Sequence, residues 1–382
     1  MAGIYIHIPF CKQACYYCNF HFSTSLALKN EMIGSLLFEI EIRSKSDQRN
    51  ISIIDPGEEI STIYFGGGTP SLLSYQELEK ILSNIHSKYT VSQDAEITLE
   101  ANPDDINIEK LKEWKLAGIN RLSIGIQSFI ERDLVWMNRA HNSTQALQCI
   151  QQAREAGIPN FSIDLIFGTP GLTNEEWEKN VQTVIDLDVP HIACYALTVE
   201  PKTALDKMIH LKKKENVDND LQAEQYSILM RMMQDAGYEH YEISNFAKPG
   251  FRSRHNSSYW EGEKYIGIGP SAHSYDGKSR QWNVANNTLY IKSLRNNEIP
   301  LEIESLSDSQ KLNEYVMVSL RTMEGMDLQF VEEKFSKEER DRIETVLENK
   351  LTKGTIRKNG NKIILTDEGK LLADAISVKL FK

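Results

Sequence analysis

Residues 6–20 read IHIPFCKQACYYCNF, a short apolar run followed at once by three cysteines. The spacing is Cys11-x₃-Cys15-x₂-Cys18, so three thiols share one loop and can point at one metal centre. A structural zinc site needs four ligands, and only the histidines that flank this loop lie near enough in sequence to supply the fourth. A cubane iron–sulfur cluster on three cysteines leaves one iron without a protein ligand. We favour the cluster over zinc and over unligated thiols.

Strand-like and helix-like patterns alternate over the first 200 residues. Apolar, β-branched runs predict strands at 4–8, 61–65, 96–100, 121–126, 161–166 and 192–197. Helical periodicity predicts helices at 26–43, 75–88, 108–117, 144–156 and 175–187. Repeated strand–helix units favour a parallel sheet with right-handed crossovers. Six units are fewer than the eight of a closed TIM barrel. A doubly wound open sheet fits the same pattern, and we favour an α/β fold with a partial (β/α)6 TIM-type barrel.

The rest of the chain predicts two further parts, which gives three in all: 1–205, 206–303 and 304–382. The middle part is irregular and rich in Gly, Ser, Asn and aromatic residues, as long functional connectors often are. The last part predicts helices at 308–321, 328–335, 337–353 and 367–377, with a hairpin at the Asn-Gly turn of residues 359–360. This order indicates a winged-helix-like domain, whose usual association with DNA is fold analogy only.

Composition narrows the function classes. The chain has 382 residues and a formal net charge of −11, which argues against nucleic-acid binding. No apolar run approaches the roughly 20 residues that span a bilayer. The first eight residues lack the features of a signal peptide. Five cysteines, three of them crowded into one loop, suit a metal site in a reducing cytoplasm better than a disulfide framework. We expect a cytoplasmic protein without an indicated membrane contact, in which Cys149 and Cys194 are buried and Lys212–Lys214 lie in a solvated loop.

The cysteine spacing, placed after the first strand of a six-unit array, resembles the radical S-adenosylmethionine (SAM) superfamily. The resemblance covers about the first 200 residues and implies a 4Fe-4S cluster whose open iron binds the amino and carboxylate groups of SAM. In such enzymes the reduced cluster cleaves SAM, and the resulting 5′-deoxyadenosyl radical abstracts hydrogen from a substrate. Tyr17, the aromatic residue before the third cysteine, matches the family position that packs near the adenine.

Polar and glycine-rich motifs follow the predicted strands, where parallel sheets place their ligands. A run of glycines lets the backbone approach a ligand closely, although a tight turn also uses glycines. A single acidic residue at the end of a strand can likewise serve only as a helix cap. The resemblance assigns binding of the SAM amino group to the glycine motif of Gly67, Gly68 and Thr69. Resemblance to oxygen-independent coproporphyrinogen III oxidases assigns further SAM contacts to Tyr5, Glu100, Gln127, Arg139 and Asp164.

The chain departs from those oxidases in two ways that the heme-chaperone branch of the same family shares. The oxidases carry a fourth cysteine where this chain has Phe20, and they have an extended segment before the motif. The chaperone branch also carries His-Asn-x-x-Tyr-Trp, present here from His255 to Trp260. This resemblance implies heme as cargo, with His255 as axial ligand and with Asn256, Tyr259 and Trp260 around it. An exposed histidine beside Tyr and Trp is, taken alone, more often structural.

We therefore expect a heme chaperone that passes heme to an acceptor hemoprotein and holds a 4Fe-4S cluster and SAM. Whether SAM is cleaved, and so whether the chain is an enzyme, does not follow from the sequence. The alternative is the oxygen-independent oxidative decarboxylation of coproporphyrinogen III, and a third reading is a zinc-stabilised structural module. Arg252 and Arg254 are expected to pair with heme propionates because charge-assisted bonds suit carboxylates.

Overall fold

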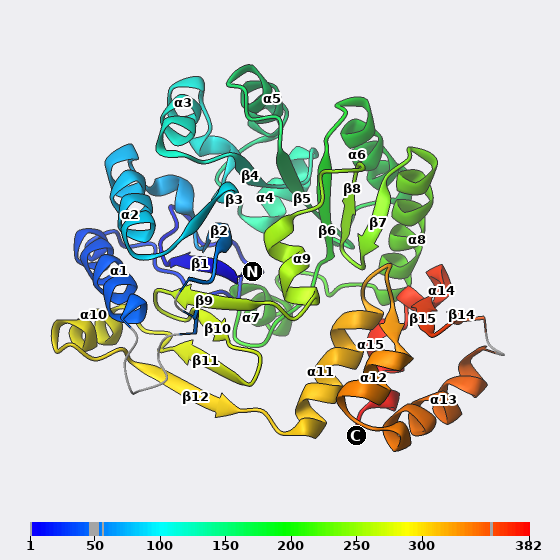
Figure 1. Ribbon diagram of the computed structural model, residues 1–382. Helices are drawn as coiled ribbons and strands as arrows, with labels where there is room; N and C mark the ends of the chain where they lie inside the picture. The colour runs from blue at the N-terminus through cyan, green and yellow to red at the C-terminus, as the bar shows by residue number, and fades with distance from the viewer. Residues whose placement is uncertain (1, 46–52, 56, 352–353) are drawn as a thin grey trace.

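A curved twelve-stranded sheet organises most of the chain (Figure 1). The computed structural model describes residues 2–45, 53–55, 57–351 and 354–382. The strand order is β12-β11-β10-β9-β1-β2-β3-β4-β5-β6-β8-β7. The six central strands are parallel and lie in chain order: β1 (Ala2–Ile8), β2 (Ile60–Gly67), β3 (Val91–Ala101), β4 (Arg121–Gln127), β5 (Phe161–Phe167) and β6 (His191–Ala196). The prediction of a partial barrel is confirmed.

Helices cover the outer, convex face of this sheet (Figure 1). They are α1 (Lys29–Ser44), α2 (Tyr75–Lys88), α3 (Ile108–Ala117), α5 (Ser143–Glu155) and α6 (Asn174–Asp186). The short helix α4 (Glu131–Met137) lies instead within the curve of the sheet. The alternation of side chains along β1 explains the two faces. Ile4, Ile6 and Ile8 belong to the main hydrophobic core. Tyr5 and His7 point to the opposite, concave side, because successive side chains of a strand alternate.

Residues 206–303, expected to be irregular, instead add strands to both edges of the same sheet. β8 (Asn245–Ala247) and β7 (Glu239–Glu242) follow β6, and β9 (Lys264–Ile268) pairs parallel to β1. β10 (His273–Tyr275), β11 (Ser279–Asn283) and β12 (Leu301–Ser305) continue beyond β9. The helices of this region are α7 (Ala204–His210), α8 (Asn219–Asp235), α9 (Arg254–Trp260) and α10 (Asn287–Arg295). These strands are three to five residues long, too short for their pattern to show in sequence. β9 and β8 pair with β1 and β6, and the other four strands pair with added strands only.

The C-terminal part has a hydrophobic core of its own, formed by residues 312–380. Its elements are α11 (Asp308–Leu320), β13 (Met326–Asp327), α12 (Leu328–Lys334), α13 (Lys337–Leu351), β14 (Ile356–Asn359), β15 (Lys362–Leu365), α14 (Asp367–Lys370) and α15 (Ala373–Leu380). The three strands form an antiparallel sheet in the order β13-β15-β14. Asn359 pairs with Lys362, so the two turn residues are Gly360 and Asn361, one residue later than predicted. Gly360 takes a positive φ of 59°, which glycine adopts readily. The last two residues of the helix predicted at 337–353 lie outside the described residues.

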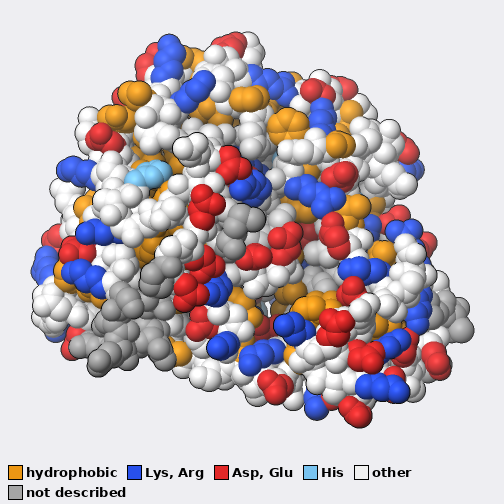
Figure 2. Space-filling model, viewed as in Figure 1, with side chains coloured by type: hydrophobic (Ala, Val, Ile, Leu, Met, Phe, Trp, Pro, Cys, Tyr) orange, Lys and Arg blue, Asp and Glu red, His pale blue; other side chains and the backbone are white. Residues whose placement is uncertain are grey.

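On the face in Figure 2, acidic side chains gather around the centre, with basic side chains interspersed. Within the described ranges, no helix combines the length and the apolar character that crossing a membrane requires.

A buried ion pair joins α1 to the added strands. Arg43 Nε donates a hydrogen bond to Glu39 Oε1 at 2.8 Å, and both side chains are almost fully buried. The Arg43 guanidinium also donates to Gln281 and Asn283 of β11. Glu39 accepts a hydrogen bond from the backbone N–H of Gly269, just after β9. The pair thus fixes where β9 and β11 lie relative to the central sheet.

Replacing Arg43 with Met should lower the free energy of unfolding by about 3–5 kcal/mol, because Glu39 would be left buried without its partner. Denaturant unfolding followed by circular dichroism measures the change. The matched control is Lys45→Met, which breaks the exposed pair of Lys45 with Glu41 on the same helix and should cost far less. Equal losses in the two variants would show that the buried pair has no special structural role.

Candidate functional site

A cavity of about 840 Å³ opens at the C-terminal ends of the parallel strands. All three cysteines of the N-terminal loop line it. Eight predicted SAM contacts line it too: Tyr17, Gly67, Gly68, Thr69, Glu100, Gln127, Arg139 and Asp164. Tyr5 lies behind this lining, with its hydroxyl 3.2 Å from His7 Nδ1 and its ring beside that of Tyr64. The structure therefore brings together the residues that the sequence placed on six different segments.

The cysteine loop lies directly against the glycine turn after β2. The backbone N–H groups of Gly68 and Thr69 donate to the carbonyls of Ile8 and Phe10 at 2.9 and 2.7 Å. A Cβ atom at Gly68 would lie 2.6 Å from the Phe10 oxygen and 2.7 Å from the Ile8 oxygen. No real Cβ atom tolerates such contacts with backbone, so only glycine permits this approach. The glycine motif thus positions the thiols as well as the cavity floor.

The three thiols form a donor set that fits an iron–sulfur cluster. Each cysteine is half-buried at the cavity wall. Burial raises the pKa of Cys11 to about 11 and also raises the pKa of Cys18. Cluster binding would therefore release protons, since thiolates are the ligands. Among the described residues, no three His, Cys, Asp or Glu side chains surround a point for one ion. A cubane differs from a single ion because its cysteines bind separate irons.

Arg139 connects the cysteine loop to the strands. Its Nη1 donates to Cys15 Sγ at 3.2 Å and its Nη2 donates to the Gly125 carbonyl at 2.7 Å. It also donates to Asn102 Oδ1, whose amide nitrogen reaches Thr69 Oγ1 at 3.3 Å. Arg139 Nε is buried and has no hydrogen-bond partner among the described residues. An unpaired buried donor at the cavity wall fits a polar ligand. Asn102 was missed in the sequence, although it follows Glu100 in the same strand-end motif.

Two carboxyl groups lie on the cavity wall and titrate near neutral pH. Burial, followed by the nearby charge of Asp164, raises the pKa of Glu100 to about 7. Burial also raises the pKa of Asp164 to about 6. Glu100 accepts hydrogen bonds from the Tyr64 hydroxyl at 2.9 Å and from the Gly67 N–H at 3.2 Å. Its ionised form is a suitable partner for a ligand ammonium group.

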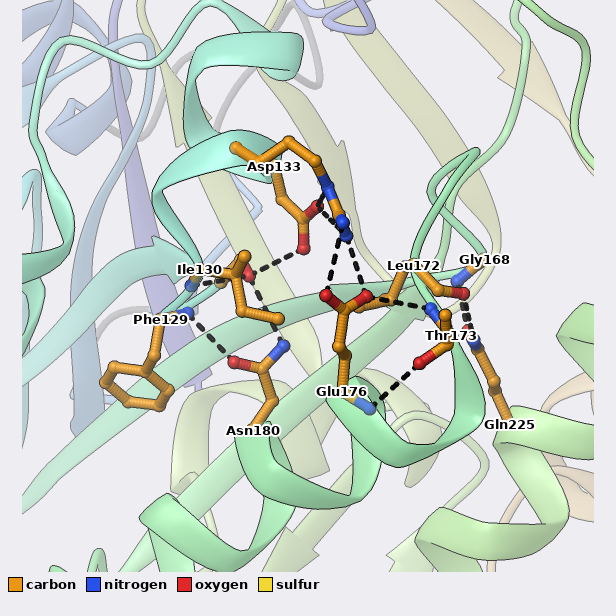
Figure 3. A network of polar contacts seen from close by, with 11 residues as sticks. Phe129, Ile130, Asp133, Gly168, Leu172, Thr173, Glu176, Asn180 and Gln225 are labelled. Carbon is orange, nitrogen blue, oxygen red and sulfur yellow. Dashed lines mark hydrogen bonds and ion pairs between the residues drawn. The ribbon is translucent and has the colours of Figure 1, made fainter.

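Gln127 ends β4 in a left-handed backbone conformation, with φ of 68°. Such a conformation is unfavourable for a residue with a side chain, and a packed surrounding must hold it. Figure 3 shows contacts of the loop that follows Gln127: Asn180 of α6 accepts a hydrogen bond from the Phe129 N–H at 3.0 Å and donates to Ser128 Oγ. Asp133 accepts a bond from the same Ser128 hydroxyl at 3.0 Å. Gln225 of α8 binds Gly168 and Leu172 in the neighbouring loop. Helices outside the sheet therefore fix the strand ends.

The expectation that His255 is exposed is wrong, because the ring is only 1% exposed. Its Nδ1 lies 2.8 Å from Thr62 Oγ1 and its Nε2 lies 2.8 Å from the Tyr259 hydroxyl. The ring stacks on Tyr64 at 4.9 Å, and Tyr64 in turn binds Glu100. Burial lowers the pKa of His255 to about 3, so the ring is neutral. His255 therefore supports the cavity wall from behind through Tyr64.

The other residues of this motif also lie mostly inside the protein. Asn256 lines the cavity, whereas Tyr259 packs against Tyr265 with ring centroids 4.6 Å apart. Trp260 has a buried indole N–H without an acceptor in the described part of the chain. The seven-residue helix α9 carries the motif: Ser253 caps its N-terminus, and the Glu96 carboxylate of β3 accepts hydrogen bonds from the backbone N–H groups of residues 254 and 255.

The two arginines expected at heme propionates are already paired with acids. Arg252 donates to Glu239 at 2.9 Å and to Glu324 at 2.8 Å. Arg254 donates to the carbonyl of Asp94 at 2.7 Å and lies 3.5 Å from its carboxylate. The propionate assignment is therefore not supported by this arrangement, since each guanidinium would first have to leave its partner.

The sequence also made predictions for the two remaining cysteines and for the lysine run at 212–214. Cys149 and Cys194 are each 1% exposed, as predicted. Lys214 was expected in a solvated loop, but its ammonium group lies 4.0 Å from the Trp136 ring centroid and 5.2 Å from that of Tyr16. Lys214 also donates to the Trp136 carbonyl at 2.8 Å. It thereby holds the segment after α7 against the cysteine loop, a contact that a run of lysines does not reveal in sequence.

The chain resembles known proteins along its whole length. Residues 5–184 match the Radical SAM superfamily, and residues 306–372 match the HemN C-terminal domain. Heme chaperone HemW of Bacillus subtilis is 35% identical over 98% of both chains. Heme chaperone HemW of Mycobacterium tuberculosis (strain H37Rv) is 32% identical over 98% of this chain and 93% of its own. Coproporphyrinogen III oxidase (HemN) from Escherichia coli has the same fold, with a TM-score of 0.85 at 22% identity over 100% of this chain and 90% of that one.

Replacing Glu100 with Gln should change how stability depends on pH in the protein without SAM. The pKa of Glu100 is raised in the folded state, so ionisation opposes folding, and this carboxyl makes the wild type lose stability as pH rises from about 4.5 to about 7. The Gln variant should lack this loss. Denaturant unfolding at pH 5, 6, 7 and 8 measures it, and Glu113→Gln, at an exposed position of α3, is the control. Parallel pH profiles for wild type and Glu100→Gln would contradict the raised pKa.

Proposed function

The chain belongs to the HemW family of heme chaperones within the radical SAM superfamily, and we propose that it binds heme and passes it to an acceptor hemoprotein. The observation that carries the proposal is the 35% sequence identity between this chain and the Bacillus subtilis heme chaperone over 98% of both chains. Phe20 supports it, since it stands where the oxidases have a further cysteine and is 68% exposed at the cavity lip. We place the protein in the cytoplasm, where reducing conditions keep its thiols free.

We propose that Cys11, Cys15 and Cys18 hold a 4Fe-4S cluster and that SAM binds beside it. When bound, this pair supplies one-electron chemistry at the sulfonium of SAM. The chain's own residues bind and orient SAM. The glycines after β2 leave room for it, Glu100 offers a carboxylate to the SAM ammonium group, and the Arg139 guanidinium fixes the cysteine loop. Eight of the nine proposed SAM contacts line the cavity, and Tyr5 acts from behind through His7.

The alternative is an oxygen-independent coproporphyrinogen III oxidase, since the solved oxidase has the same fold, and such an activity would use the same cavity of this chain. One sample separates the two activities: the full chain, reconstituted anaerobically with iron and sulfide, is titrated with heme and then assayed with reductant, SAM and coproporphyrinogen III. The chaperone proposal predicts a saturable heme spectrum and no porphyrinogen turnover. Turnover at catalytic rates, or the absence of heme binding, would overturn the proposal.

Replacing Cys15 with Ala should abolish bound iron and acid-labile sulfide in anaerobically reconstituted protein, because the cluster loses one of its three ligands. Iron and sulfide assays together with the visible absorption of the cluster measure this loss. Cys149→Ala is the matched control, since that cysteine is buried in α5 away from the cavity and should leave the iron content unchanged. Full iron and sulfide in the Cys15 variant would show that the cluster is held elsewhere.

A further inference from the structure

The part of the N-terminal loop that carries the second and third cysteines packs against a small hydrophobic cluster of its own. Phe10, just before the first cysteine, belongs to the main core, whereas Tyr16 and Tyr17 pack against this separate cluster. The buried members of the cluster are Met137 of α4, Ile166 of β5, Leu197 after β6 and Leu205 of α7. The position of the thiols therefore depends on α4 and on the segment that contains α7.

Hydrogen bonds join the loop to the same two neighbours. The Tyr16 N–H donates to the Met137 carbonyl at 3.2 Å, and the Tyr16 carbonyl accepts a bond from the Leu205 N–H at 2.8 Å. The side-chain amide of Asn138, just after α4, donates to the Ala14 carbonyl at 2.8 Å. The loop is thus held on both sides at the residue that follows its second cysteine.

Lys214 adds a third contact at the same place. Its ammonium group lies 4.0 Å from the ring centroid of Trp136 and 5.2 Å from that of Tyr16, and it donates to the Trp136 carbonyl at 2.8 Å. Cations are attracted to the faces of aromatic rings. These three residues lie outside the lining of the cavity. Among the described residues, no carboxylate lies within ion-pair distance of this ammonium group, so no acid balances its charge.

We infer that Lys214 is a positioning residue for the iron–sulfur cluster: it holds the cysteine loop through Tyr16 and Trp136, and its charge raises the reduction potential of the cluster. The inference rests on the proposed function, because that proposal supplies the cluster. Reduction by one electron from an external reductant adds one negative charge to the cluster and its three thiolates. A fixed cation nearby stabilises this more negative state, and net charge is one of the factors that set the potential of such clusters.

The other lysines near the loop differ from Lys214. Lys212 and Lys213 are exposed, and in the described part of the chain their ammonium groups contact neither an acid nor an aromatic ring. Lys12 lies within the loop itself but is paired with two aspartates, which balance its charge. Arg139 contacts the loop from the cavity wall, where a change would also alter the proposed SAM site. Lys214 is therefore the position at which a charge can be removed without touching that site.

The test compares four forms of the full, anaerobically reconstituted chain without SAM: wild type, Lys214→Gln, Lys214→Arg and Lys213→Gln. Glutamine keeps a donor for the Trp136 carbonyl but carries no charge, whereas arginine keeps the charge and stacks on aromatic rings. Lys213→Gln removes the same charge from the exposed neighbouring residue. Each form is titrated with dithionite in the presence of redox mediators, and electron paramagnetic resonance measures the reduced cluster at each potential.

We expect the ratio of reduced to oxidised cluster at a given potential to be at least threefold lower in Lys214→Gln than in wild type. For a one-electron couple this is a fall of about 28 mV in the midpoint potential. Lys214→Arg should have the wild-type midpoint, and Lys213→Gln should keep it as well. An unchanged midpoint in Lys214→Gln, or an equal fall in Lys213→Gln, would overturn the inference. The midpoint is read from the clusters that are present, so a lower iron content does not affect it.

The outcomes separate this inference from the proposed function. An unchanged midpoint in Lys214→Gln leaves the cluster and the chaperone proposal standing. Wild-type protein without iron and acid-labile sulfide would overturn the proposed cluster and the inference with it. Heme titration of the same wild-type sample tests the chaperone proposal independently of the midpoint potentials.

Discussion

The site depends on one close approach, between the cysteine loop and the glycine turn after β2. Two backbone hydrogen bonds join them, and the space where a Gly68 side chain would begin is filled by the carbonyls of Ile8 and Phe10. Because β1 and β2 are adjacent parallel strands, their C-terminal ends place the thiols and the glycine cradle at the same mouth. Arg139 then joins the loop to β4, so that four segments share one rigid wall.

The buried His-Asn-x-x-Tyr-Trp motif extends this wall from behind. His255 contacts β2 through Thr62, and its ring supports Tyr64, which binds the carboxylate of Glu100. A change at His255 therefore reaches the SAM cavity through two contacts, without any contact between His255 and a ligand in the cavity.

Much of the fold and of the cavity could be predicted from the sequence, because long apolar runs and strand-end motifs have strong local signals. The six parallel strands and the eight residues that line the cavity are such cases. The added strands β7 to β12 could not be predicted, since they are only three to five residues long and their pairing with neighbouring strands of the sheet defines them. The burial of His255 was missed for a related reason. Its partners, Thr62 and Tyr64, lie 193 and 191 positions earlier in the chain, and no local pattern reports them.

The central claim is that three thiolates hold a cluster and leave one iron open to SAM beside the glycine cradle. Electron paramagnetic resonance of the chemically reduced, reconstituted protein, recorded with and without SAM, tests it most directly. The account predicts a cluster signal whose g values shift when SAM is added, because the ligand binds the open iron. A signal that SAM leaves unchanged at saturating concentration, or a reduced protein with no cluster signal, would contradict it.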